Sequence, residues 1–488
     1  MEREEIEELT THDIKQRSVS GVVALVSRTF IVQIITFVST LVLTIFLDPN
    51  TYGIFYLVSS VVNLLAYFSD IGLAAALIQK KERLTREDIA TTFTIQQILV
   101  ICLVLLLFLA SPIVKSQYGI SPEGIFLLYS MGISFFLSSL KTIPSILLER
   151  DIKFHKLILP QILETLAFNT VAVLAAWKGL GINAFSLAVL ARGVVGLIAI
   201  YCVFPWTPVI GIYRSSLKSL LRFGIPYQAN TFLAVLKDDG MTIILTRIIG
   251  TQGLGYLGWA SRWAGLPLRI FMDNLTKVSF PAFARLQHDK VNLARAIELN
   301  LKYLTLASFP ILIGMGFVAF PMTGIIPRYV KWIPALIPLY IQLYNSAWAG
   351  ISTSLTNLLN ATGRIKTTFK LMTMWTVLTW ALFPITAMKF GYLGVSFSIG
   401  ILATTSIITV VLARRAVSFS IIKALKTPVL SSLILFAFLL LLKSSLNSLQ
   451  NIIVISALSI IVYAFACFLL EGRRLIDDSI SLFKSRNA

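Results

Sequence analysis

Charged residues are scarce in this sequence: they make up 13% of its 488 residues, whereas 56% are hydrophobic and the mean hydropathy is +0.82. A soluble protein of this length cannot cover so much apolar surface with so few charges. The apolar residues come in blocks of about 18–25, the length that spans the hydrocarbon core of a bilayer. The sequence therefore predicts an all-α polytopic membrane protein.

Cysteines and nucleotide-binding motifs are equally sparse. The three cysteines, Cys102, Cys202 and Cys467, lie inside apolar blocks without metal-ligand spacing, which predicts small buried hydrophobic side chains rather than disulfides or a metal site. There is no G-x-x-x-x-G-K-[ST] loop, which argues against a P-loop ATPase. No connection is long enough for the catalytic outer loop that membrane glycosyltransferases and ligases usually carry. The sequence predicts a protein that is not an enzyme and has no cofactor.

Acidic residues are outnumbered by basic ones, 23 to 42, which gives a net charge of +19. The position of the basic residues shows that they report membrane topology rather than nucleic-acid binding. The hydropathy pattern predicts about fourteen spans, and twelve is the alternative count because the thirteenth is short. The predicted spans are roughly 18–47, 52–78, 90–114, 122–147, 157–177, 180–204, 223–249, 254–278, 299–321, 333–359, 367–388, 391–412, 428–443 and 451–470.

Lys and Arg gather in the connections on one side of these spans, together with the two termini. This excess predicts that both termini lie in the cytoplasm. The N-terminal sequence is charged and acidic and predicts a short amphipathic segment, not a cleaved leader. The connections of the other side carry only Lys115, Lys178, Arg328, Lys331, Lys389 and Lys443.

Two short phrases of the sequence echo one another. "LTIFLDPNTYGIF" at 43–55 and "LTRIIGTQGLGYL" at 245–257 each lie at the outer end of an odd-numbered span, six spans apart. "KGLGINAFSLA" and "FGYLGVSFSIG", and the turns "LLERDIKFHKL" and "LLNATGRIKTTFKL", keep a similar spacing. We expect Gly53 and Gly255 to serve tight turns, since glycine accepts positive φ. Six spans return the chain to its starting side, so the halves are predicted to be parallel repeats.

This repeat predicts two six-helix lobes plus two extra C-terminal helices. The expected organisation is a cytoplasmic amphipathic N-terminus at 1–17, an N-lobe at 18–204, an inter-lobe linker at 205–222, a C-lobe at 223–412, the two added spans at 428–470 and a cytoplasmic tail at 471–488.

Several charges fall inside the predicted spans, where each costs a few kcal/mol or more unless it faces protein or water. Polar residues recur at helical spacing on spans one, two, seven and eight. These stripes are Thr29, Gln33, Thr36, Thr40 and Thr44; Tyr56, Ser60, Asn63, Tyr67 and Asp70; Gln228, Thr231, Asp238 and Thr242; and Arg262, Arg269, Asp273 and Thr276. Two lobes that present such stripes to each other would form a hydrated cleft with a net positive charge. Such a cleft would favour an anionic substrate. Arginine suits a phosphate because its guanidinium donates hydrogen bonds to two phosphate oxygens at once. The predicted substrate-binding cations are Arg28, Arg247, Arg262, Arg269 and Lys277.

The same spans carry polar and acidic residues that are candidates for the cleft wall or for coupling to H⁺ or Na⁺. Structural alternatives remain open: the end-of-span cations can snorkel to the interface, and the acids can pair with neighbouring cations. Trp259 and Trp263 either stack on sugars or belong to an interfacial belt. The polar candidates are Gln33, Asn63, Asp70, Glu164, Asp238, Asp239 and Asp273.

The order of four sequence blocks resembles the polysaccharide-transporter family of the MOP flippase superfamily, in particular its colanic-acid-exporter-like branch, the Wzx-type O-antigen flippases. The blocks are "KQRSVSGVVALVSRTFIVQIITFVSTLVLTIFLDPNTYG", "IGLAAALIQKKERLTREDIATTFTIQ", "TIPSILLERDIKFHKL" and "RIIGTQGLGYLGWASRWAGLP". The likeness covers most of spans one to eight. The chain departs from the family at Ile45, where an Arg is common, and at Met241, where an Asp is expected.

This resemblance implies a MOP flippase fold in the bacterial cytoplasmic membrane. It implies transport of an undecaprenyl-diphosphate-linked oligosaccharide to the outer leaflet by alternating access, and contact with a glycan polymerase or assembly complex. By position, Arg28, Arg262 and Arg269 would approach the diphosphate. The alternatives are a cation-coupled exporter of small amphiphiles, as in the MATE family, and a structural subunit of a glycan-assembly complex. An exporter of cationic drugs would need an acidic cavity, whereas the predicted cleft is positive.

Overall fold

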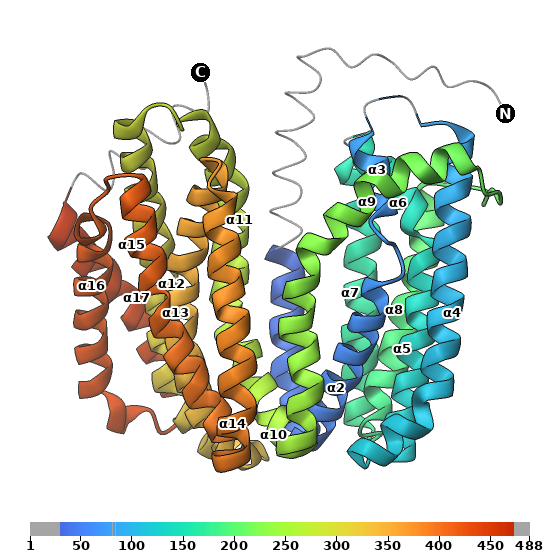
Figure 1. Cartoon of the computed structure of the whole chain (residues 1–488). Coiled ribbons are helices and arrows are strands. Elements are labelled where there is room, and N and C mark those ends of the chain that lie inside the picture. Colours follow the sequence, from blue (N-terminus) through green and yellow to red (C-terminus); the bar gives the residue numbers. More distant parts are fainter. Residues whose placement is uncertain (1–29, 81, 83, 152, 473–488) are drawn as a thin grey trace. The chain divides into compact units, whose positions relative to one another are not determined.

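The structure is a computed structural model of the whole chain, and it describes residues 30–80, 82, 84–151 and 153–472 (Figure 1). This described part contains helices and no strand, which confirms the all-α class. Eight of its helices are long and apolar enough to cross a membrane. Contacts between helices divide the chain into two compact units, the first ending at Thr251 and the second beginning at Gln252.

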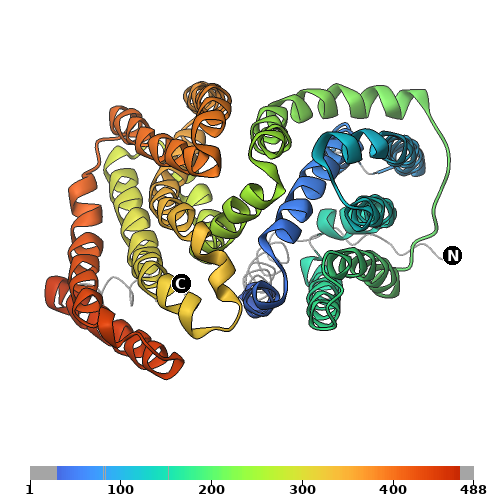
Figure 2. The same ribbon diagram turned by 90° about the horizontal axis from the view of Figure 1, so that it is seen from below.

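The first unit begins with a helical segment, Phe30–Phe46. Figure 2 looks along several helices of this unit, of which α5, α7 and α8 pack together. Its remaining elements are α2 (Pro49–Tyr67), α3 (Leu73–Gln79), α4 (Arg86–Tyr118), α5 (Pro122–Leu140), α6 (Thr142–Arg150), α7 (Phe154–Trp177), α8 (Asn183–Val203), α9 (Arg214–Val235), the π-helix η1 (Leu236–Gly240) and the first part of α10 (Met241–Ala264).

The second unit is centred on α12, which packs against α11, α13, α16 and α17. The buried core of this unit includes Leu301, Leu355 and Ala413 from three different helices. Its elements after α10 are α11 (Leu266–Arg285), α12 (Lys290–Ile325), the 3₁₀-helix η2 (Tyr329–Ala335), α13 (Leu336–Ala361), α14 (Ile365–Thr405), α15 (Ile407–Ala416), α16 (Ile421–Leu441), the 3₁₀-helix η3 (Lys443–Ser445) and α17 (Leu449–Glu471).

Helix starts in both units follow local capping chemistry. Thr85 and Asp88 form a reciprocal capping box at the start of α4, and Ser121 caps α5 ahead of a proline. Asp289 caps α12, where hydrogen bonds from the backbone N–H and side chain of Asn292 hold the pKa of its carboxyl below the usual value. The predicted thirteenth span falls on α16, which begins earlier, at Ile421, directly after the Ser420 cap.

The glycine prediction for the two echoed turns is wrong. Gly53 lies inside α2, and Gly255 lies inside α10. The second phrase turns at Gly250, whose φ is 73°, while the first turns at Asp48, ahead of Pro49. The later echo does turn on a glycine, because α14 is broken at Gly391 with a φ of 61°. Both breaks separate helices that the sequence predicted as consecutive spans.

Many large apolar side chains lie on the surface of the protein, in addition to those in its core. Large apolar side chains such as Leu109, Leu441 and Ile460 are 78%, 82% and 72% exposed, as expected for a surface covered by lipid. Small hydroxyl residues are buried among the apolar core, where many donate to the carbonyl four residues earlier, as Thr44 does to Thr40. This pattern is consistent with a polytopic membrane protein.

Two details of the predicted packing need correction. Cys102 and Cys202 are exposed on the outer faces of their helices, and only Cys467 is buried. Periodicity alone did not separate the lipid-facing side from the protein-facing side of these uniformly apolar helices. Thr40 of the predicted water-lining stripe on span one is also buried, 3% exposed, so that part of the stripe packs inside the first unit.

The added helices α16 and α17 attach to α12 by polar contacts as well as apolar ones. The ammonium of Lys302 lies 2.6 Å from a carboxylate oxygen of Glu471, and Thr427 donates to the other oxygen at 3.2 Å. Tyr463 donates to the carbonyl of Leu306 at 3.1 Å. Helices α16 and α17 are therefore integral parts of the second unit.

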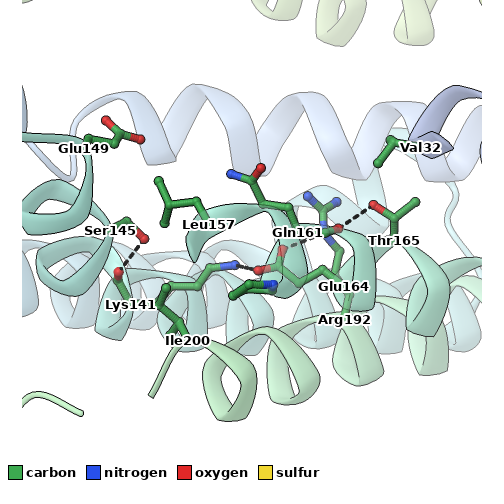
Figure 3. A pocket seen from close by; sticks show the side chains of 11 residues that line it. Val32, Lys141, Ser145, Glu149, Leu157, Gln161, Glu164, Thr165, Arg192 and Ile200 are labelled. Atoms are coloured by element: carbon green, nitrogen blue, oxygen red, sulfur yellow. Dashed lines mark hydrogen bonds and ion pairs between the residues drawn. The ribbon is translucent and has the colours of Figure 1, made fainter. Parts of the chain in front are cut away.

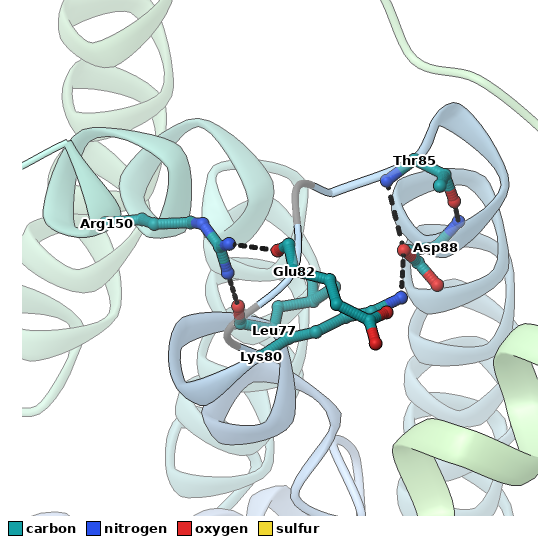
Figure 4. A network of polar contacts seen from close by, with 6 residues as sticks. All are labelled: Leu77, Lys80, Glu82, Thr85, Asp88 and Arg150. Atoms are coloured by element: carbon teal, nitrogen blue, oxygen red, sulfur yellow. Dashed lines mark hydrogen bonds and ion pairs between the residues drawn. The ribbon is translucent and has the colours of Figure 1, made fainter. Parts of the chain in front are cut away.

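The connection between α3 and α4 is held by a polar network at one end of the first unit (Figure 4). Arg150 of α6 donates to the carbonyls of Leu77 at 2.6 Å and Glu82 at 2.5 Å. Lys80 pairs with Asp88 at 2.6 Å, and Asp88 is almost fully buried. The guanidinium of Arg150 thus links the end of α3 to the middle of the connection, while Lys80 and Asp88 hold its α4 end.

Replacing Arg150 by alanine is expected to loosen this connection without unfolding the unit. Two charge-assisted hydrogen bonds, each worth about 1.5–3 kcal/mol, are lost at carbonyls that water can then reach. Hydrogen–deuterium exchange should become at least tenfold faster in the peptide covering residues 77–85. Lys153→Ala is the matched control, because Lys153 belongs to an exposed pair with Asp151. Equal exchange in both variants would contradict this role for Arg150.

Candidate functional site

The first candidate region is a polar seam inside the first unit, where α2 packs against α9 and η1. At one end Tyr67 donates to the carbonyl of Gln228, whose side-chain amide donates back to the carbonyl of Tyr67 at 2.5 Å. Farther along α2, Ser60 and Asn63 hydrogen-bond the carboxylate of Asp239. The polar stripe predicted on span two therefore meets span seven, through Gln228 of the stripe predicted there and through Asp239, which lay outside that stripe.

A π-helix aims Asp239 at this seam. The five residues Leu236–Gly240 wind more widely than the α-helices on either side, and such bulges recur at functional sites because they rotate side chains off the regular register. Asp238 instead points outward, 68% exposed, and pairs with the neighbouring Lys237. Met241, where the family pattern expects an Asp, is buried at 2% exposure. Asp239 is therefore the seam carboxylate of this chain.

The far end of the seam joins the two echoed turns. Thr251 donates a hydrogen bond to the side-chain oxygen of Asn50. Arg247 lies one helical turn before Thr251, and its side chain is exposed. Its positive charge interacts electrostatically with Tyr118 at the end of α4. Arg247, predicted as a substrate-binding cation, thus lies close to the turn at Gly250, at the end of its helix.

Other predicted polar residues have local roles. Asp70 follows the end of α2 and accepts from the backbone N–H of Ala74 at 3.0 Å, so its carboxylate caps the first turn of α3. Gln33 is half-buried in the segment Phe30–Phe46. Arg28 lies outside the described residues.

The second candidate region is a row of charges on α11 in the second unit. Arg269, Asp273 and Lys277 follow at intervals of four residues, so they lie along one helix face, and all three are exposed. The charges of Arg269 and Lys277 both act on Asp273. Another face of α11 packs on α13, where Asn357 donates to Thr276 at 3.3 Å. The row carries a surplus of positive charge.

The residues before this row belong to the interior of the second unit. Arg262 is half-buried near the end of α10, one turn before the break at Gly265. Trp259 and Trp263 are 5% and 7% exposed, and Trp259 stacks on Trp332 with ring centroids 5.1 Å apart. Both predictions for these tryptophans, sugar stacking and an interfacial belt, are wrong, because each side chain is a packed part of the core.

The third region is an ion cluster that the sequence analysis did not assemble. Glu164 of α7 lies between Lys141, at the junction of α5 and α6, and Arg192 of α8. The ammonium of Lys141 is 2.5 Å from one carboxylate oxygen of Glu164. Charges in spans four, five and six were the available signal, but spacing within one helix does not show which helices meet. Glu164 was expected to serve ion coupling, and its carboxylate is occupied by these cations.

Metal binding has no support in the described residues, which bring together no group of three His, Cys, Asp or Glu side chains suited to one ion. The candidate regions are therefore a polar seam, a cationic helix face and an ion cluster.

Comparison with known sequences decides the family. The family described as "Polysaccharide biosynthesis protein" matches residues 42–332, more than half of the chain. The chain belongs to this family. The match confirms the polysaccharide-transporter assignment within the MOP superfamily, and it covers the α2–α9 seam, the α11 row and the ion cluster.

Individual members of this family are distant relatives. The succinoglycan biosynthesis transport protein ExoT of Rhizobium meliloti (strain 1021) is 24% identical over 286 residues, which cover 58% of this chain and 57% of ExoT. The teichuronic acid biosynthesis protein TuaB of Bacillus subtilis (strain 168) is 26% identical over 50% of this chain and 51% of TuaB. The lipopolysaccharide biosynthesis protein WzxC of Escherichia coli (strain K12) is 24% identical over 73% and 72%. The chain thus spans little more than half the length of ExoT and TuaB.

Solved structures show the fold of this polysaccharide biosynthesis protein. The lipid II flippase MurJ in an inward closed conformation matches with a TM-score of 0.72 at 16% identity, over 93% of this chain and 99% of MurJ. An inward-facing MATE multidrug transporter of the MOP superfamily matches with a TM-score of 0.60 at 16% identity, over 81% and 98%. At such identities the likeness concerns the fold, and it confirms the predicted MOP architecture.

Proposed function

We propose that this protein is a flippase that moves an undecaprenyl-diphosphate-linked oligosaccharide from the inner to the outer leaflet by alternating access, for polysaccharide export. The observation that carries the proposal is the exposed row Arg269–Asp273–Lys277 on α11. The sequence predicts that this row lies in a membrane span, where cations are costly unless they face a ligand or water. Membership of the polysaccharide biosynthesis family and the names of the relatives agree with a glycan as the cargo.

The chemistry of the row suits a diphosphate. A guanidinium donates two parallel hydrogen bonds to phosphate oxygens, and an ammonium adds a compact positive charge. The sequence also predicts Arg28, Arg247 and Arg262 as substrate-binding cations. In this scheme the prenyl tail stays in lipid, the glycan crosses through water, and the protein acts as a transporter rather than an enzyme.

Export of cationic amphiphiles is the alternative that the MATE-like fold raises. Such cargo needs an acidic, aromatic cavity, whereas the exposed charges on α11 are mainly positive and Trp259 and Trp263 are packed in the core. A structural subunit without transport of its own is the other alternative, and the transport assay below separates it from a flippase.

Alanine in place of Arg269 or Lys277 is expected to lower the initial rate of translocation about tenfold or more. A hydrogen bond to a charged group contributes about 1.5–3 kcal/mol, and a factor of ten corresponds to about 1.4 kcal/mol. The measurement is the transfer of fluorescent undecaprenyl-diphosphate glycan across proteoliposomes that contain the full-length protein.

Lys290→Ala provides the matched control, because Lys290 is exposed at the start of α12 and away from the row. It should transport at the wild-type rate. Wild-type rates in both α11 variants would remove the row from the mechanism, and absence of translocation by the wild-type protein would favour the structural subunit.

We further propose that Asp239 couples transport to H⁺ or Na⁺. Its carboxylate joins η1 to Ser60 and Asn63 of α2, so a bound proton or sodium ion changes the contact between spans two and seven. Asp239→Asn is expected to abolish the acceleration by whichever gradient, pH or sodium, drives wild-type transport. Asp238→Asn is the control, because Asp238 points out of the seam. A gradient response that survives in Asp239→Asn would contradict the assignment.

The proposed location is the bacterial cytoplasmic membrane, with both termini in the cytoplasm. The distribution of Lys and Arg supports this orientation. A glycan polymerase or other assembly proteins are the proposed partners, since the outer-leaflet product must be taken up by the next step of polymer assembly.

A further inference from the structure

A polar pocket opens inside the first unit, away from the α11 row. Its volume is about 380 Å³, and its wall comes from α6, α7 and α8 together with Val32 (Figure 3). Small-molecule sites typically measure about 300–1,000 Å³, so this pocket has room for a ligand of about one ring. A whole lipid-linked oligosaccharide does not fit. The polar side chains of its wall are Lys141, Ser145, Glu149, Gln161, Glu164, Thr165 and Arg192.

The two oxygens of Glu164 are in different situations. Oε1 accepts from Lys141 at 2.5 Å, whereas Oε2 lies 3.7 Å from Nε of Arg192. The second distance exceeds the range of a direct hydrogen bond. The side chains of Glu164 and Lys141 are 11% and 18% exposed, while that of Arg192 is 59% exposed. One side of the carboxylate is therefore saturated, and the other faces a guanidinium across a gap.

This long ion pair determines which ligand group could contact both partners from the pocket side. A group that bridges Oε2 and the guanidinium must donate to the carboxylate and accept from the cation, and a hydroxyl does both. The charges around the pocket cancel, since Lys141 and Arg192 are matched by Glu149 and Glu164. A neutral ligand with several hydroxyls is therefore preferred over an anion.

We infer that this pocket binds one neutral sugar ring, with a ring hydroxyl bridging Glu164 and Arg192. The inference rests on the proposed function in one respect, namely that the ring belongs to the glycan being transported. A free hexose carries the same chemistry and serves as the probe.

Gly196 of α8 keeps the carboxylate in place. A Cβ at this position would lie 2.6 Å from the carboxyl carbon of Glu164, closer than real side chains approach. Gly196→Ala is therefore expected to displace the Glu164 carboxylate without replacing Lys141 or Arg192. Gly196→Ala and Arg192→Met thus disturb the bridge from opposite sides.

The test is saturation-transfer NMR and calorimetry on the purified full-length protein in detergent. The probes are glucose, galactose, N-acetylglucosamine, glucuronate and inorganic phosphate. We expect saturable binding of at least one neutral sugar, weakened at least tenfold by Arg192→Met and by Gly196→Ala. Lys178→Met, on an exposed turn after α7, should bind as the wild type does. Unchanged thermal midpoints identify the variants that are correctly folded.

The inference is overturned if no neutral sugar binds, or if neither pocket variant weakens binding. It is also overturned if only glucuronate and phosphate bind, because the pocket is then an anion site. The transport assay separates this result from the proposed function. Translocation without sugar binding leaves the flippase and removes the pocket, whereas sugar binding without translocation leaves the pocket and removes the flippase.

Discussion

Methionine in place of Lys141 is expected to lower the free energy of unfolding by about 3–5 kcal/mol, since it leaves the buried carboxylate of Glu164 without its main partner. Arg192 cannot take over, because its Nε stays 3.7 Å away and its side chain is largely exposed. The loss should appear as a lower thermal midpoint and a smaller folded fraction after heating in detergent.

The double variant Lys141→Met/Glu164→Gln is the informative companion. It removes both charges, so the burial cost of the carboxylate disappears together with its partner. Its stability should therefore recover toward the wild-type value. Lys153→Met removes a cation from an exposed pair and should change stability by less than about 1 kcal/mol. Equal losses in the single and double variants would contradict the ion-pair explanation.

Alanine at Gly72 is the second large effect, with an expected loss of roughly 2–5 kcal/mol. Gly72 has a φ of 77°, which costs other residues about 1–2 kcal/mol. In addition, its new Cβ would lie 2.6 Å from the Cα of Gly224 in α9, and overpacking against backbone costs about 1–3 kcal/mol. Because this contact docks α9 on α3, the thermal midpoint of the protein should fall clearly.

Gly179 offers a matched control for this substitution. Its φ is 79°, almost the same as that of Gly72, but a Cβ there would meet no atom within 4 Å. Gly179→Ala should therefore show only the backbone cost, and the difference between the two variants measures the α3–α9 contact. Equal losses would show that close approach of α9 contributes nothing.

The polar stripe on span two was predictable from the sequence, whereas its acidic partner on span seven was not. Helical spacing correctly put Ser60 and Asn63 on one face of span two. It did not identify Asp239 as their partner, since a π-helix shifts the register of span seven by the amount that distinguishes Asp238 from Asp239. A period read from sequence assumes a regular helix, so it fails where the helix widens.

The charged residues also differ in whether their grouping was predictable from the sequence. Helical spacing predicted one face with Arg262, Arg269, Asp273 and Thr276. The structure keeps Arg269 and Asp273 on one exposed face, where Lys277 joins them, because all three lie on one helix. The cluster of Lys141, Glu164 and Arg192 comes from three separate helices, and its existence depends on how α7 and α8 pack. The buried positions of Trp259 and Trp263 also depend on packing partners, in particular Trp332.

By itself, the sequence determined that this chain crosses a membrane many times as helices, and it carried the resemblance to a flippase family that the family comparison confirmed. Hydrophobic length and helical periodicity are properties of one segment at a time, so no tertiary information was needed. The tertiary structure alone decided which buried charges neutralise each other, which glycines form turns, and where a pocket opens. These depend on side chains that are distant in sequence coming within a few ångströms, and the energy of burying a charge depends on that distance.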